Sequence, residues 1–179
     1  MEEQERQLVV DQLSASRERL LELVRGLTRE QWTFHPGEGR WSIGDCLEHI
    51  TIVENRVFGS IAAQLAGAPQ EREPTHEKDA VVTKAMPDRS VRREARAAVR
   101  PAGHWREAAE LLSEFDKARA RTAQFVAATD ADLRAYFVPH AAFGDLDCYQ
   151  WLLVLSLHGV RHARQIEEIK ADPAFPRPD

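Results

Sequence analysis

The sequence predicts an all-α protein, a four-helix bundle with a long crossover connection between its second and third helices. Four segments carry apolar residues with the 3.6-residue period of an amphipathic helix, and strand-like alternation of useful length is absent. The segment 66–103 between the second and third helices is long and rich in proline and charged residues. We expect one domain over residues 1–179, because this length and 43% hydrophobic residues suffice for one sizeable core.

The first two helices are expected at residues 3–27 and 41–66. The first has an apolar stripe formed by Val9, Leu13, Leu20, Val24 and Leu27. Turn-forming residues around Pro36 then interrupt the helical pattern. Ser42, with Asp45 three residues later, forms a variant of the capping box and predicts the start of the second helix.

The last two helices are expected at residues 104–128 and 146–170. The crossover before them contains Pro69, Pro74, Pro87 and Pro101, and we expect a short helix within it, near Ser90 to Ala98. A second connection with Pro139 and Gly144 leads into the fourth helix. That helix contains the most apolar run of the chain, Trp151 to Leu155.

The composition indicates a cytoplasmic protein. A formal net charge of −5 gives no basic excess, so nucleic acid is not an expected partner. The two cysteines, Cys46 and Cys148, form no disulfide pattern and suit a reducing compartment as thiols. No secretory signal and no apolar stretch of bilayer-spanning length is recognisable, so no membrane association is expected.

Three histidines stand where an apolar core residue is expected. His158 and His162 are four residues apart on the inner face of the fourth helix, so both imidazoles could reach one ion. A hydrogen-bonded pair of core histidines would have the same spacing. His49, on the inner face of the second helix, adds a third imidazole. Burying imidazoles without partners is costly, and one divalent metal ion would satisfy a nitrogen on each ring.

Several neighbouring residues have a functional and a structural interpretation. Asp45 could be a general base, a fourth ligand or an acceptor for a ligand imidazole, but capping is its favoured role. Gln165 could bind substrate or a ligand imidazole, or make an interhelical hydrogen bond. Arg161 points away from His162, which favours a salt bridge over substrate contact, and Cys46 is interpreted as a small buried hydrophobe rather than a ligand. No ligand role is expected for His35, His76, His104 and His140.

Two motifs resemble those of the DinB-like superfamily. One is Trp41-Ser42-Ile43-Gly44-Asp45-Cys46-Leu47-Glu48-His49-Ile50, which is similar to the second helix of that superfamily. The other, more specific, is the turn His140-Ala141-Ala142-Phe143-Gly144-Asp145-Leu146, followed by Trp151-Leu152 and by His158-Gly159-Val160-Arg161-His162-Ala163-Arg164-Gln165-Ile166. Two positions depart from the commoner pattern, Ala141 in place of a frequent proline and Asp45 in place of a frequent glutamate.

The resemblance implies that one histidine of the second helix and two of the fourth bind a divalent ion. His49, His158 and His162 match those positions. Zinc or nickel is the expected ion, with iron or manganese as alternatives. Relatives in this superfamily are described either as metal-dependent hydrolases or as transferases that use a low-molecular-weight thiol as cosubstrate.

Three protein ligands would leave a coordination position open, as in catalytic zinc sites. An activated water or an external thiolate could occupy it, and the sequence does not choose between them. The leading hypothesis is therefore a hydrolase or thiol transferase acting on a small molecule between the second and fourth helices. The alternatives are a non-catalytic metal-binding or stress-related bundle and a purely structural module that forms a homodimer.

Overall fold

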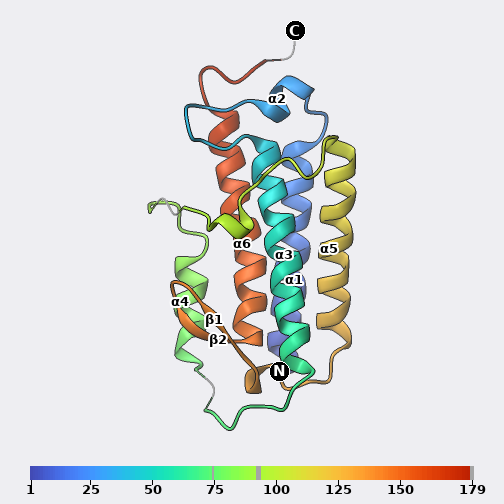
Figure 1. The fold of residues 1–179 in the computed structure, drawn as a ribbon, viewed down its shortest axis with the longest axis vertical. Coiled ribbons are helices and arrows are strands. Elements are labelled where there is room, and N and C mark those ends of the chain that lie inside the picture. The colour runs from blue at the N-terminus through green and yellow to red at the C-terminus, as the bar shows by residue number, and fades with distance from the viewer. Residues whose placement is uncertain (74, 92–93, 178–179) are drawn as a thin grey trace.

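Four long helices form the body of the protein and run along a common axis (Figure 1). They are α1 (Glu3–Val24), α3 (Ile43–Leu65), α5 (Ala108–Ala128) and α6 (Cys148–Lys170). The computed structural model describes residues 1–73, 75–91 and 94–177. The arrangement confirms the predicted four-helix bundle. No helix in these described ranges is long and apolar enough to cross a membrane.

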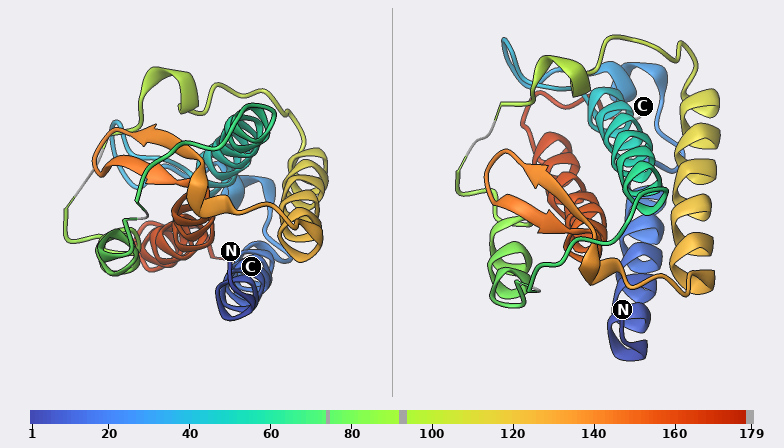
Figure 2. Two further views of the ribbon diagram at one scale, coloured as in Figure 1. Left: turned by 90° about the horizontal axis from the view of Figure 1, so that it is seen from below. Right: turned by 60° about the horizontal axis from the view of Figure 1, so that its bottom comes forward.

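The long crossover sets the topology of the bundle. It returns the chain from the end of α3 to the opposite end of the molecule, so α5 starts beside the start of α3 and the two helices run in the same direction (Figure 1). Seen end-on, α1 packs against α5 and α6, and α3 packs against the same two helices (Figure 2). Helices α3 and α6 are therefore direct neighbours, as a site shared between them requires.

The structure corrects the expected content of the crossover. A helix is present at α4 (Glu77–Ala85), and the segment expected to be helical near Ser90 to Ala98 contains only a short 3₁₀ turn, η1 (Ala97–Val99). Residues 92–93 of that segment lie outside the described ranges. Helix α4 has acidic residues in its first turn, Lys84 in its last and Val82 buried, features that favour a helix there. A further short helix, α2 (Arg29–Thr33), lies in the predicted break after α1.

The expectation that the chain has no strands is wrong at one place. Strands β1 (Phe137–His140) and β2 (Gly144–Asp147) pair antiparallel, with Phe137 opposite Asp147 and His140 opposite Gly144. The first strand does not alternate apolar and polar residues and contains Pro139, and the second has only one large apolar residue, Leu146, so neither gives a clear strand pattern. The hairpin follows a second 3₁₀ turn, η2 (Leu133–Ala135), and packs against α3 and α6.

The helix ends agree with local capping chemistry. Ser42 caps α3 by accepting a hydrogen bond from the Asp45 backbone N–H (3.1 Å), and the Asp45 carboxylate accepts one from the Ser42 N–H (2.9 Å). Helix α6 begins after the N-cap Asp147, two residues later than expected. Helix α5 begins at Ala108, four residues later than expected, after a turn in which Gly103 has a φ of +72°.

A polar layer divides the core into two apolar halves. One half includes Leu13, Val57, Val126 and Leu153, and the other includes Leu20, Ile50, Phe115 and Ile166. Between them, the fully buried Arg119 of α5 donates to Glu54 of α3 (3.0 Å) and to the Ser16 hydroxyl of α1 (2.9 Å). Gly159 of α6 lies against this layer and leaves no room for a side chain, because a Cβ there would come within 3.1 Å of Ser16.

Replacing Arg119 with methionine should destabilise the protein by about 3–5 kcal/mol, because it leaves the Glu54 carboxylate buried without a counter-ion. Urea unfolding followed by circular dichroism measures this change. The matched control is Lys117→Met on the same helix, whose exposed ion pair with Glu114 should contribute less than about 1 kcal/mol. Equal stabilities of the two variants would contradict the assignment of the buried pair.

Candidate metal centre

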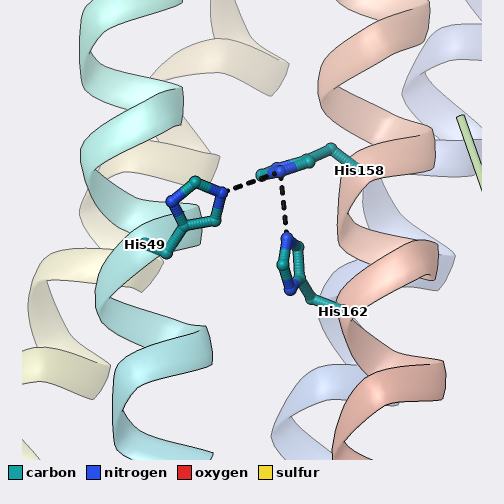
Figure 3. Close-up of side chains that lie close together, drawn as sticks. All are labelled: His49, His158 and His162. Carbon is teal, nitrogen blue, oxygen red and sulfur yellow. Dashed lines mark hydrogen bonds between the residues drawn. The ribbon is translucent and has the colours of Figure 1, made fainter. Parts of the chain in front are cut away.

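Three histidine side chains from two helices converge between α3 and α6. The Nε2 atom of His158 lies 3.1 Å from Nε2 of His49 and 3.0 Å from Nε2 of His162 (Figure 3). His158 and His162 come from adjacent turns of α6, and His49 faces them from α3. In tetrahedral zinc sites with bonds of 2.0–2.1 Å, ligand nitrogens are separated by about 3.3 Å. The spacing of these nitrogens is therefore close to that of a coordinating set.

The other ring nitrogen of His49 is bound to the backbone. Its Nδ1–H donates a hydrogen bond of 2.6 Å to the carbonyl oxygen of Val99, in the crossover. This bond places the proton on Nδ1 and directs the lone pair of Nε2 at the other two histidines. Metal-ligating histidines commonly donate their second N–H to a carbonyl or carboxylate in this way.

The environment keeps these imidazoles neutral. Burial lowers the pKa of His49, and it lowers the pKa of His158 and His162 well below the ordinary value. The neighbouring histidines and Arg161 lower the pKa of both α6 histidines further, while the Gln165 amide opposes the shift at His162. Neutral rings offer lone pairs to a cation, and a single N–H on His158 cannot satisfy both facing nitrogens.

Two further contacts shape the group. The Trp41 ring stacks on His162, with centroids 6.0 Å apart, and lies 4.8 Å from the ring of His49. The Nε2 atom of His162, not its buried Nδ1, faces His158. Packing against Trp41 therefore holds the rings of His49 and His162 in place while their Nε2 atoms point at His158.

A second cluster of possible ligands has a different explanation. Glu5, His76 and Asp79 also place potential ligand atoms within 4.8 Å of one another. The guanidinium of Arg134 already binds both carboxylates of this cluster, and it binds Asp147 as well. A cation is thus supplied by the chain itself, and we assign this cluster a structural role.

Glu48, the residue before His49, anchors the crossover from the same helix. Its buried carboxylate accepts hydrogen bonds from the backbone N–H groups of Ala102, Gly103 and His104, at 2.9–3.1 Å, and from His104 Nδ1 at 2.6 Å. Burial alone would raise the pKa of Glu48, but these hydrogen bonds outweigh it and the pKa lies below its ordinary value. Adjacent residues of α3 therefore hold both Val99 and the turn that follows it.

The other candidates from the sequence have structural partners. Asp45 caps α3, as favoured above, and its carboxylate lies outside the histidine group. The Cys46 thiol lies in an apolar cluster with its pKa raised by burial, and it too lies outside that group. Gln165 accepts a hydrogen bond of 3.0 Å from Arg89 of the crossover. Arg161 donates hydrogen bonds to the backbone carbonyl oxygens of Asp88 and Val91 in the crossover.

The histidine group lies in the wall of a cavity of about 390 Å³. Side chains of α3 and α6, the crossover and the β-hairpin line it, and one of them is His140, for which no ligand role was predicted. The Nδ1 atom of His140 accepts hydrogen bonds from the backbone N–H groups of Ala142 and Phe143. A cavity that reaches the three imidazoles gives a small molecule access to any ion held there.

Comparison with known proteins identifies the family. The family model described as the DinB superfamily matches residues 12–166. The chain belongs to this superfamily. This DinB-superfamily protein is 25% identical over 147 residues to the uncharacterized protein YuaE of Bacillus subtilis (strain 168), a match that covers 82% of this chain and 88% of YuaE. The match confirms the resemblance seen in the two motifs.

Two solved structures have the same fold. YfiT from Bacillus subtilis, described as a probable metal-dependent hydrolase with an unusual four-helix bundle topology, aligns with a TM-score of 0.66 and 13% identity. That alignment covers 98% of this chain and 91% of YfiT. TT2238, described as a four-helix bundle protein, aligns with a TM-score of 0.56 and 23% identity over 91% of this chain and 98% of TT2238. At these identities the likeness establishes the fold.

Glu48→Gln should destabilise this DinB-superfamily protein by about 1–3 kcal/mol, because an amide nitrogen then faces backbone N–H donors that need an acceptor. Urea unfolding measures the loss, and hydrogen exchange at Ala102, Gly103 and His104 should become faster. Glu110→Gln, at an exposed position of α5, is the control and should change neither quantity. Unchanged exchange at these three amides would contradict the anchoring role of Glu48.

Proposed function

We propose that the protein binds one divalent metal ion through His49, His158 and His162 and uses it to transform a small molecule in the adjoining cavity. The observation that carries the proposal is the convergence of three buried Nε2 atoms at the cavity wall. Helices α3 and α6 supply these atoms on rigid backbone, and the Val99 carbonyl orients the first of them.

The donor set fits the expected ions. Three neutral imidazoles suit zinc or nickel, and iron or manganese are weaker alternatives. Three protein ligands leave room for one exchangeable ligand, which would enter from the cavity. When bound, such an ion lowers the pKa of a coordinated water or stabilises a coordinated thiolate.

Hydrolysis is the reaction class that we favour. The fold likeness to YfiT, itself described as a probable metal-dependent hydrolase, supports this choice. Thiol transfer would use the same open position, but neither Cys46 nor Cys148 lines the cavity, so an external low-molecular-weight thiol would have to supply the sulfur. In both cases the surrounding side chains hold the substrate, and the three histidines hold the ion.

Metal analysis tests the site directly. Protein purified without a metal-binding tag and reconstituted with zinc should retain about one ion per chain, and His158→Ala should retain little. His104→Ala, which changes a histidine outside the group, should retain the same metal as the parent protein. Chelation should lower the melting temperature of the parent and leave that of His158→Ala unchanged, because a ligand bound only to the native state stabilises it. A parent protein that takes up no metal would overturn the proposal.

Turnover separates the catalytic role from a purely structural metal. The zinc- and nickel-loaded protein should hydrolyse activated esters, or transfer a thiol such as cysteine to an electrophilic dye, faster than the metal-free protein. His162→Ala should lose that rate while keeping its helical circular dichroism. A metal that raises the melting temperature, with no turnover in either assay, would support the non-catalytic alternative instead.

A further inference from the structure

The cavity beside the three histidines has a largely apolar wall. Its apolar lining comes from α3, α6, the β-hairpin and the residue after α4, and includes Val53, Val57, Val154, Trp151, Val138 and Met86. Such a surface is unfavourable for a strongly hydrated molecule and favourable for an apolar body. The wall thus sets one requirement for a ligand, which must bring an apolar part of several atoms.

Two arginines add a charge to this surface. Arg56, on α3, stands two helical turns beyond His49 on the same face of the helix, and Arg96 precedes the turn η1. Both line the cavity and both are exposed. Within the described ranges, neither guanidinium has a carboxylate or carbonyl partner.

The remaining charged groups of the lining are engaged. Glu94 pairs with Arg100, which lies outside the lining, at 3.6 Å, and Arg161 donates to carbonyl oxygens of the crossover. Among the residues that the structure describes, the Arg56 and Arg96 guanidinium groups of the lining thus have no carboxylate partner, in a chain whose net charge is −5. Guanidinium groups present a fork of N–H donors that matches carboxylate, sulfonate and phosphate oxygens.

We propose that the cavity binds an anionic small molecule with an apolar body. Arg56 binds the anionic group, the apolar wall covers the body, and the far end of the molecule reaches the histidine group. Arg96, three residues before the Val99 that His49 contacts, adds a second positive charge to the wall. Seven residues separate Arg56 from His49, which corresponds to about 10 Å along α3, and this sets the length of the ligand. The role of the far end rests on the proposed metal function, but the anion subsite itself does not.

A pair of dyes tests this subsite. 8-Anilinonaphthalene-1-sulfonate and N-phenyl-1-naphthylamine share an apolar body, and only the first carries an anionic group. We expect the parent protein to bind the sulfonate dye more tightly than the neutral one, measured by fluorescence titration. The double variant Arg56→Gln/Arg96→Gln should weaken sulfonate binding about five- to tenfold and leave binding of the neutral dye unchanged, since each exposed ion pair contributes up to about 1 kcal/mol.

A matched double variant controls for the change in net charge. Arg25→Gln/Arg106→Gln removes two exposed arginines outside the cavity lining and should bind both dyes like the parent. Arg56→Lys/Arg96→Lys should keep most of the sulfonate affinity, because it keeps the charge. The proposal is overturned if the parent binds the two dyes equally, if the cavity variant keeps its sulfonate affinity, or if it loses affinity for both dyes alike.

The titrations are run on metal-free and zinc-loaded protein, so that the two proposals can fail separately. An arginine-dependent preference for the sulfonate dye in a protein that binds no zinc would retain the anion subsite and reject the metal site. Zinc bound at one ion per chain without that preference would do the opposite.

Discussion

The structure depends on satisfying polar groups that are buried halfway along a helical bundle. An all-apolar core would pack more simply, yet a polar layer of Ser16, Glu54 and Arg119 crosses the bundle, flanked along α6 by His158 and His162. The arginine and the glutamate satisfy each other across α3 and α5. Within the described ranges no carboxylate pairs with His158 or His162, and the facing Nε2 atoms have a spacing close to that of a set of metal ligands. That difference separates a structural part of the layer from a part available for chemistry.

The crossover connects this interior to the surface. It makes α3 and α5 parallel, and it passes over the open side of the α3–α6 pair (Figure 1). Glu48 and His49 bind the crossover at residues 99–104, while Arg161 and Arg164 of α6 bind its carbonyl oxygens at residues 87–91. The crossover therefore orients His49, supplies part of the cavity wall and carries Arg96.

The four helices could be predicted because each has a long stretch of apolar residues with the 3.6-residue helical period. The inward histidines could be predicted because imidazoles stand at positions where that period places apolar core residues. Other features left no signal in the sequence. Every residue type has a backbone carbonyl, so nothing in the sequence marks Val99 as the partner of His49. The two four-residue strands show no clear alternation of apolar and polar residues. The crossover helix was misplaced although the sequence does carry signals at α4, with acidic residues in its first turn and Lys84 in its last. Packing of the buried Val82 against the bundle adds to them. Glu48 did leave a signal, since it is a charged residue within the motif of residues 41–50 and lies next to the predicted ligand His49.

X-ray absorption spectroscopy of the zinc-loaded protein tests the central claim most directly, because it identifies the atoms bound to the ion. The account predicts three imidazole nitrogens and one further light atom at about 2.0–2.1 Å, with one imidazole fewer in His49→Ala. In buffer free of thiols, a sulfur neighbour at about 2.3 Å would instead place Cys46 or Cys148 on the ion. An unchanged first shell in His49→Ala would also contradict the account, because α3 would then contribute no ligand.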